Sequence, residues 1–240
     1  MYFLGTLGIV AALCGICRNA IKDCPLALYL VAIVLDVFLL IVMSEPVPKP
    51  LLLPASILLR RGGLAVSLFV IVMFIGVLPR ESRVSRWFRP IRAELSIAAC
   101  ILIAGHMGTY LAQYATNLFA YHASQAYMIP AFIVALFLLL LTVLLGATSL
   151  RVVKRHMSAA SWRRLQGLAY VFYALVYLHV FLLLGPSAFR GSQPALTNVI
   201  VYSAIFGIYA VLRIWRAHID RKNRINLDET VTGQGFRQEH

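Results

Sequence analysis

His106 and His179 are the only histidines inside long apolar segments of this 240-residue chain. His106 lies 14 residues after Arg92, and His179 lies 15 residues after Arg164. At a rise of about 1.5 Å per residue, both imidazoles are expected about 21 to 23 Å from the basic ends of their helices. An ionisable side chain is costly in hydrocarbon and indicates a functional site by default. Imidazole is also a common axial ligand of haem iron, so two histidines at one depth predict a bis-histidine haem site.

Residue types near the two histidines are compatible with a flat cofactor. Gly105 precedes His106 and has no Cβ, which would let a macrocycle approach the helix backbone. Tyr110, Tyr173 and Tyr177 lie close to the histidines in sequence and could supply aromatic contact surface. We therefore predict cofactor contacts for these four residues and iron ligation for the histidines, although glycines and aromatics are also ordinary in membrane helices.

The composition and the apolar runs predict an all-α polytopic membrane helical bundle with six to seven transmembrane helices. Hydrophobic residues make up 61% of the chain, too many for a soluble domain of this length. The first apolar run is short. Because it lacks a basic n-region and a small-residue cleavage site, we expect a retained helix rather than a signal peptide. Runs near the ~20 residues that span a bilayer occur at 2–17, 26–43, 62–78, 93–113, 127–147, 165–184 and 196–214.

Basic residues set the expected orientation. The net charge of +13 comes mainly from short segments at 79–92 and 148–164 and from the C-terminal tail, which fits the positive-inside pattern and not nucleic-acid binding. The connections at 114–126 and 185–195 carry one arginine between them and are expected to face outward. This predicts a multi-pass protein of the cytoplasmic (inner) membrane, with a cytoplasmic C-terminus and the haem in the outer half of the bilayer. Arg60 and Arg61 fall on the outer side and are the exception.

Several short motifs resemble a known family. They are Ala147-Thr148-Ser149 at the end of one apolar run, the segment 162–170 that begins Trp-Arg-Arg-Leu-Gln, and Tyr177-Leu178-His179. With His106 they are similar to the ferric reductase-like transmembrane domain family, and most of all to the haem-binding membrane subunits of bacterial periplasmic methionine sulfoxide reductase systems. The resemblance covers residues 58–214, the expected ferric reductase-like haem-binding core. The N-terminal transmembrane helices with their Pro-rich outer connection (1–57) and the basic cytoplasmic tail (215–240) lie outside it.

Gln166 departs from the pattern of that family. Relatives commonly carry Trp-x-x-Leu-His, with the histidine at the inner membrane edge, where this chain has Gln166. Gln166 and His179 are 13 residues apart, about 20 Å along a helix, as expected between an inner and an outer haem. Because glutamine is not a usual haem ligand, we expect one haem b per chain.

Three further ionisable residues have both an ordinary and a functional interpretation. His156 in a basic loop and His122 in an outer loop are more simply solvated histidines, although His122 could contact a redox partner or a haem propionate. Asp36 lies inside an apolar run, where it could accept a proton from a quinol or pair with Arg60 or Arg61 across helices.

The family resemblance implies an electron-transfer subunit of an oxidoreductase system. A haem b would carry electrons from a membrane quinone, or from a cytosolic reductase, to an extracytoplasmic reductase or flavoprotein. The chain has no Gly-rich phosphate loop and no paired carboxylates placed for acid–base catalysis, so we assign no catalytic residue and expect a separate electron source. Two alternatives are a small-solute or proton-coupled transporter that uses the histidines as a proton relay, and a structural membrane subunit without a cofactor.

Overall fold

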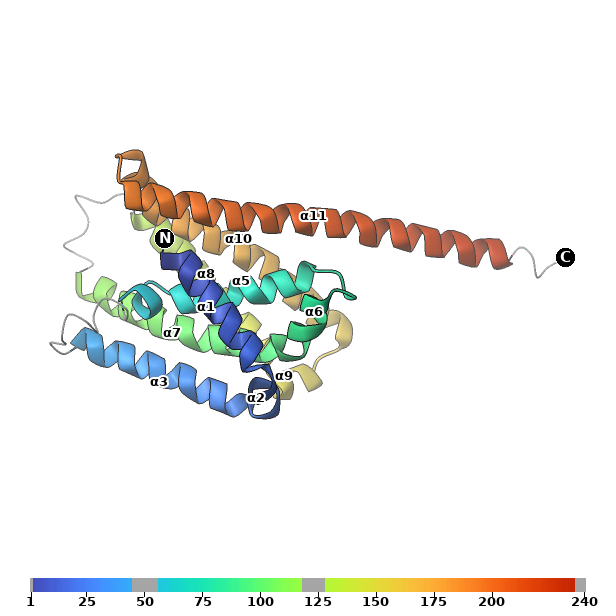
Figure 1. The fold of residues 1–240 in the computed structure, drawn as a ribbon, viewed down its shortest axis with the longest axis horizontal. Helices are drawn as coiled ribbons and strands as arrows, with labels where there is room; N and C mark the ends of the chain where they lie inside the picture. The colour runs from blue at the N-terminus through green and yellow to red at the C-terminus, as the bar shows by residue number, and fades with distance from the viewer. Residues whose placement is uncertain (1, 45–55, 118–127, 236–240) are drawn as a thin grey trace.

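The computed structural model describes residues 2–44, 56–117 and 128–235, and these ranges form helices and turns without any β-strand (Figure 1). The prediction of an all-α membrane helical bundle is confirmed. Both the Pro-rich connection after Ser44 and the outer-loop residue His122 lie outside the described residues. The elements are α1 (Tyr2–Ile16), α2 (Arg18–Asp23), α3 (Pro25–Ser44), the π-helix η1 (Ser56–Arg60), α5 (Gly63–Val77), α6 (Arg83–Phe88), the 3-10 helix η2 (Arg89–Ile91), α7 (Arg92–Asn117), α8 (Met128–Ser149), α9 (Arg151–Arg155), α10 (Ala159–Phe189) and α11 (Gln193–Gly235).

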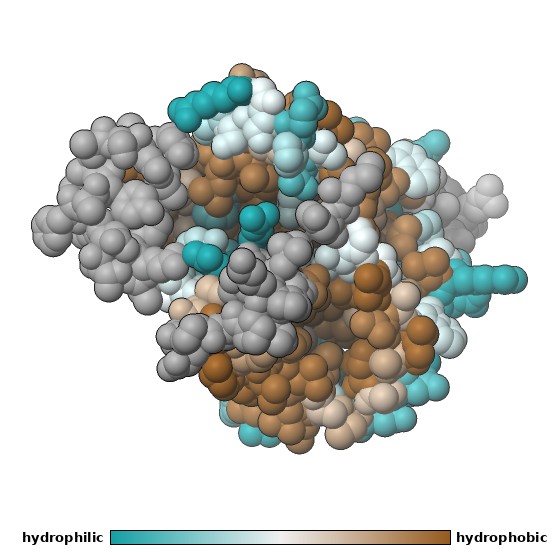
Figure 2. Space-filling model, turned by 60° about the vertical axis from the view of Figure 1, so that its left-hand side comes forward, coloured by the Kyte–Doolittle hydropathy of each residue, from teal (hydrophilic) through white to brown (hydrophobic). Residues whose placement is uncertain are grey.

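Each of the predicted apolar runs forms a helix. In the described part of the chain, five helical stretches are long and apolar enough to cross a bilayer: Pro25–Met43, Arg83–Leu111, Ile129–Ser149, Ala159–Phe189 and Gln193–Lys222. Large apolar side chains such as Leu30, Val34 and Leu140 are exposed, and hydrophobic surface covers much of the face shown in Figure 2. The chain is therefore a multi-pass membrane protein whose apolar flanks face lipid.

α5 is the central helix of the bundle. It has 15 residues, about 22 Å of helix, which is shorter than the ~30 Å hydrocarbon layer. Its residues are apolar on every side and most of them are buried, as expected for a helix surrounded by protein. α1, α7 and α11 pack against it. A short helix is accommodated here because other helices of the bundle, rather than lipid, surround it.

α7 and α10 carry the two histidines, and α8 packs against both of them. α10 also packs against α11, while α3 packs against α7 and lies at the edge of the bundle in Figure 1. The two histidine helices are thus joined mainly through α8, and a cavity occupies the space that they share with α8.

The three basic segments meet at one end of the bundle, which we call the arginine-rich end. It comprises α6, α9 and the part of α11 from residue 213 onward (Figure 1). Arg151 of α9 forms an ion pair with Glu94 of α7 at 3.3 Å, and Arg213 of α11 lines a cavity together with Arg92. The N-terminus lies toward the opposite end. The three basic segments are therefore gathered at one end of the helices, as the positive-inside pattern predicts, while Arg60 and Arg61 lie elsewhere.

α11 extends well past the other helices and continues to Gly235 (Figure 1). The helix has no break at 214–215, where the basic tail was expected to begin. At the other boundary, α1 and α3 pack directly against α5 and α7 of the expected haem-binding core. The N-terminal helices are thus part of the same bundle.

Candidate functional site

His106 of α7 and His179 of α10 line the same cavity, which has a volume of about 540 Å³. α1, α5, α8 and α11 complete the walls, together with the turn from Arg61 to Gly63. Most of the lining side chains are apolar, and the volume lies within the about 300–1,000 Å³ typical of cofactor pockets. The tertiary structure therefore brings the two predicted ligands to one apolar cavity.

The ring of His106 is held by a backbone carbonyl. Its Nδ1 lies 2.6 Å from the carbonyl oxygen of Arg60. A carbonyl oxygen can only accept a hydrogen bond, so Nδ1 carries the ring proton of the neutral imidazole. The lone pair is then on Nε2, which has no hydrogen-bond partner among the described residues.

His179 is held in the same way by a different helix. Its Nδ1 lies 3.0 Å from the carbonyl oxygen of Ala131, in the first turn of α8. Nδ1 again donates, which leaves the Nε2 lone pair without a partner within the described ranges. Histidines that bind metals commonly donate their other ring N–H to a carbonyl, because that bond fixes the tautomer and the ring orientation. Both side chains therefore have the hydrogen-bonding state that is typical of a metal-binding histidine.

Gly62 shapes the wall next to His106, although it was not among the predicted site residues. Its φ of +69° lies in the left-handed region that favours glycine. The residue links η1 to α5, and its N–H donates to the carbonyl of Leu59 at 2.8 Å. A Cβ on Gly62 would lie 3.5 Å from Nδ1 of His106. The turn thus brings the backbone at the end of η1 to the imidazole. In the sequence, the only sign of this turn was a glycine pair directly after two arginines.

The two arginines that were exceptions to the charge scheme lie beside this site. Arg61 lines the cavity. The guanidinium carbon of Arg60 lies 5.9 Å from the ring centroid of Tyr110, and the Tyr110 ring lies 5.0 Å from the His106 ring, centroid to centroid. Tyr110 is also part of the cavity lining. A cofactor that carries carboxylates would therefore meet a cation at this edge.

Tyr173 and Tyr177, which were predicted to contact the cofactor, face α11 instead. Tyr173 stacks on an aromatic ring of α11 at 4.2 Å between centroids, and the Tyr177 hydroxyl lies 2.9 Å from Oγ of Ser203. The cavity is lined by the residues directly before them, Phe172 and Val176. One position along a helix turns a side chain by about 100°, so the tyrosines point away from the cavity.

Gly105 allows close approach of α3 and is not part of the cavity lining. Its N–H donates to Oδ2 of Asp36 at 3.2 Å, and a Cβ on Gly105 would overlap the carboxyl group. Oδ1 of Asp36 is buried and has no hydrogen-bond partner among the described atoms. One interpretation expected Asp36 to pair with Arg60 or Arg61. In the structure its carboxyl group instead accepts a hydrogen bond from the N–H of Gly105, the residue before His106.

Gln166 has a partner at the arginine-rich end of the bundle. Its Nε2 donates to the Thr148 hydroxyl at 3.1 Å, and the Trp162 Nε1 donates to the Thr148 carbonyl at 3.0 Å. Residues from the resembling motifs therefore meet where α8 ends and α10 begins. His156 and His218 are exposed and do not line the cavity.

Comparisons with known proteins show a similarity to a bacterial protein. No protein-family model matches the chain, and no solved structure matches it. Over 182 residues the chain is 34% identical to an uncharacterized protein of Treponema pallidum (strain Nichols). The matched region covers 74% of this chain and 49% of that protein, so the chain spans about half the length of the curated relative that it matches. Because that protein is uncharacterized, the function has to be argued from the cavity.

Proposed function

We propose that the chain is a haem b membrane subunit that binds one haem through Nε2 of His106 and Nε2 of His179. The observation that carries the proposal is a pair of imidazoles on one cavity, each with its Nδ1 proton donated to a backbone carbonyl. Two such ligands are too few for a zinc site, and no group of three or more His, Cys, Asp or Glu side chains in the described residues could hold a bare ion. Two imidazoles are the number that a haem iron needs, since the porphyrin supplies four nitrogens.

A bound haem b would supply one-electron transfer. The chain itself fixes both imidazoles, lines the cavity with mostly apolar side chains, and would offer a cation at Arg61 to a propionate. Phe69 and Phe172 meet edge to face in the wall, with ring centroids 4.8 Å apart. This rigid aromatic contact helps to define the shape of the cavity.

We further propose that electrons leave toward an extracytoplasmic reductase or flavoprotein. Under the positive-inside pattern the arginine-rich end would face the cytoplasm, and the histidine cavity would then lie in the outer half of the membrane. A membrane quinol suits the donor better than a cytosolic reductase, because the inner ligand position is occupied by Gln166, which is hydrogen-bonded to Thr148. The resemblance to the ferric reductase-like family supports the same direction of transfer.

Haem content tests the proposal directly. The purified chain should show a reducible b-type absorbance spectrum, and His106→Ala and His179→Ala should each abolish bis-histidine ligation. His156→Ala and His218→Ala are matched controls, because both side chains are exposed and away from the cavity, and they should keep the full spectrum. Pyridine haemochromogen titration against protein concentration should give one haem per chain.

A second measurement separates ligation from misfolding. Free imidazole added to His179→Ala should restore the low-spin spectrum, because the truncated side chain leaves room for it. An unchanged low-spin spectrum in His179→Ala without imidazole would refute the histidine pair. A wild-type chain that is folded but takes up no haem when haem is supplied would refute the function and favour a transporter or a structural subunit.

A further inference from the structure

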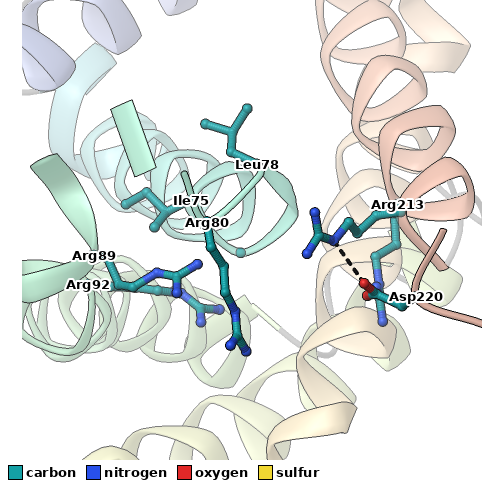
Figure 3. A pocket seen from close by; sticks show the side chains of 9 residues that line it. Ile75, Leu78, Arg80, Arg89, Arg92, Arg213 and Asp220 are labelled. Atoms are coloured by element: carbon teal, nitrogen blue, oxygen red, sulfur yellow. Dashed lines mark ion pairs between the residues drawn. The ribbon is translucent and has the colours of Figure 1, made fainter. Parts of the chain in front are cut away.

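A second cavity lies at the arginine-rich end of the bundle and shares no lining residue with the histidine cavity. It has a volume of about 300 Å³ and is formed where α5 ends, α7 begins and α11 passes. Figure 3 shows Arg80, Arg89 and Arg92 on one side of this cavity and Arg213 and Asp220 on the other. The charged residues in its lining are Arg80, Arg89, Arg92, Arg213, Arg216 and Asp220.

Two of these arginines are fixed in place by neighbouring groups. Nε of Arg92 donates to the carbonyl of Val72 at 3.1 Å, and a Cβ on Gly76 would lie 3.1 Å from its guanidinium. The guanidinium of Arg213 lies over the Tyr170 ring at 4.4 Å from the centroid. Ordered guanidinium groups lose little conformational freedom when they bind an anion, so these contacts prepare the site for a ligand.

Among the described residues, carboxylates do not balance the positive charge in this cavity. Asp220 is the only carboxylate in the lining, and it already pairs with Arg216 at 3.2 Å. Within the described residues, Arg80 and Arg89 have no ion-pair partner. Like charges that converge next to a low-dielectric membrane repel one another, and a bound anion would relieve that repulsion.

The positive-inside pattern explains why arginines occur at this end but not why they converge. Arg80 and Arg213 are 133 residues apart in the chain and come from segments that could have pointed away from each other. Arg83 and Arg86 show the alternative, since they lie on α6 at the same end and do not line the cavity. The arginines that line the cavity converge and the α6 arginines do not, which indicates an anion-binding site.

We propose that Arg80, Arg89, Arg92 and Arg213 bind a phosphate group at this end of the bundle. Arginine is suited to this ligand because its planar fork donates two parallel hydrogen bonds to phosphate oxygens. Basic pockets between transmembrane helices near the headgroup layer bind anionic lipid headgroups. The phosphate can belong to such a headgroup or to a soluble phosphate compound, and the cavity is large enough for either phosphate but not for a whole lipid.

The test is a titration of the delipidated, detergent-solubilised full chain. Native mass spectrometry would measure binding of phosphatidylglycerol, with phosphatidylcholine, which has no net charge, as the control lipid. Thermal unfolding would measure how much inorganic pyrophosphate stabilises the chain. The variant Arg80→Gln/Arg213→Gln should weaken binding by about tenfold or more, equal to about 1.4 kcal/mol. The control Arg83→Gln/Arg86→Gln removes the same charge from the same end and should change the dissociation constant by less than about twofold.

The two ligands distinguish the source of the phosphate. Selective binding of phosphatidylglycerol identifies a lipid headgroup, whereas stabilisation by pyrophosphate without lipid selectivity identifies a soluble ligand. Equal weakening in both double variants would mean diffuse electrostatic attraction and would overturn the site. Absence of any binding by a wild-type chain that elutes as a folded species would overturn it as well.

Discussion

Replacing Gly105 with alanine should disrupt the packing of α3 against α7. The added Cβ would overlap the carboxyl group of Asp36, and Oδ2 of that group accepts a hydrogen bond from the Gly105 N–H at 3.2 Å. Either the carboxyl turns away or α3 moves outward, and both changes break this hydrogen bond. Oδ1 of Asp36 has no partner among the described atoms, so the side chain has no second hydrogen bond to hold it.

The expected loss of stability has two sources and one offset. A buried polar group that loses its hydrogen bond costs about 1–3 kcal/mol. Forcing an extra carbon into a packed contact costs about 1–3 kcal/mol more. Alanine in place of glycine within a helix raises the free energy of unfolding by roughly 0.5–1 kcal/mol, which partly offsets these losses. The free energy of unfolding should therefore fall by about 1–5 kcal/mol.

Unfolding in mixed detergent micelles, followed by circular dichroism, measures this change. Gly108→Ala is the matched control, because it lies on the same helix and no atom lies within 4 Å of its Cβ position. It should be neutral or slightly stabilising. Asp36→Ala in combination with Gly105→Ala removes the overlap, so the double variant should be more stable than the sum of the single effects by more than roughly 0.5 kcal/mol.

Two results would refute this reasoning. One is equal stability of Gly105→Ala and Gly108→Ala, and the other is simple additivity in the double variant with Asp36→Ala. Either result would mean that α3 does not approach Gly105 closely. The glycine would then be available to a cofactor, as the sequence by itself suggested.

Three other substitutions test the site and its supports. Gly62→Ala should cost about 1–2 kcal/mol through its left-handed backbone and also lower haem absorbance, since a shift of this turn would move the Arg60 carbonyl that accepts the Nδ1 proton of His106; Gly191→Ala, with φ +88° and no atom within 4 Å, should show only the backbone cost. Glu94→Ala should lower the free energy of unfolding in micelles by about 1–3 kcal/mol, because this buried carboxylate accepts hydrogen bonds from a tyrosine of α3 and an arginine of α9. Gln166→His should leave the pyridine haemochromogen titration at one haem per chain, because α7 has no second histidine to complete an inner pair; two haems in this variant would contradict the single-site proposal.

The sequence by itself determined the membrane class and the position of the helices. The apolar runs at 2–17 and 62–78 correspond to Tyr2–Ile16 and Gly63–Val77 in the structure. Hydropathy and backbone hydrogen bonding act between neighbours in the chain, and an apolar segment in lipid satisfies its backbone only as a helix. The sequence also placed His106 and His179 at similar depth, because depth along a helix follows from counting residues. The structure brings both to one cavity.

Only the tertiary structure decided which way each side chain faces. Tyr173 turns toward α11 and Gly105 toward α3, while the tyrosine at 110 remains in the cavity lining. Arg80 and Arg213 converge although they are distant in the chain. Rotation of a helix about its axis depends on which neighbours its surface fits, and that fit involves the side chains of the whole bundle. A hydropathy pattern without polar stripes, as in α5 with apolar residues on every side, contains no information about that rotation.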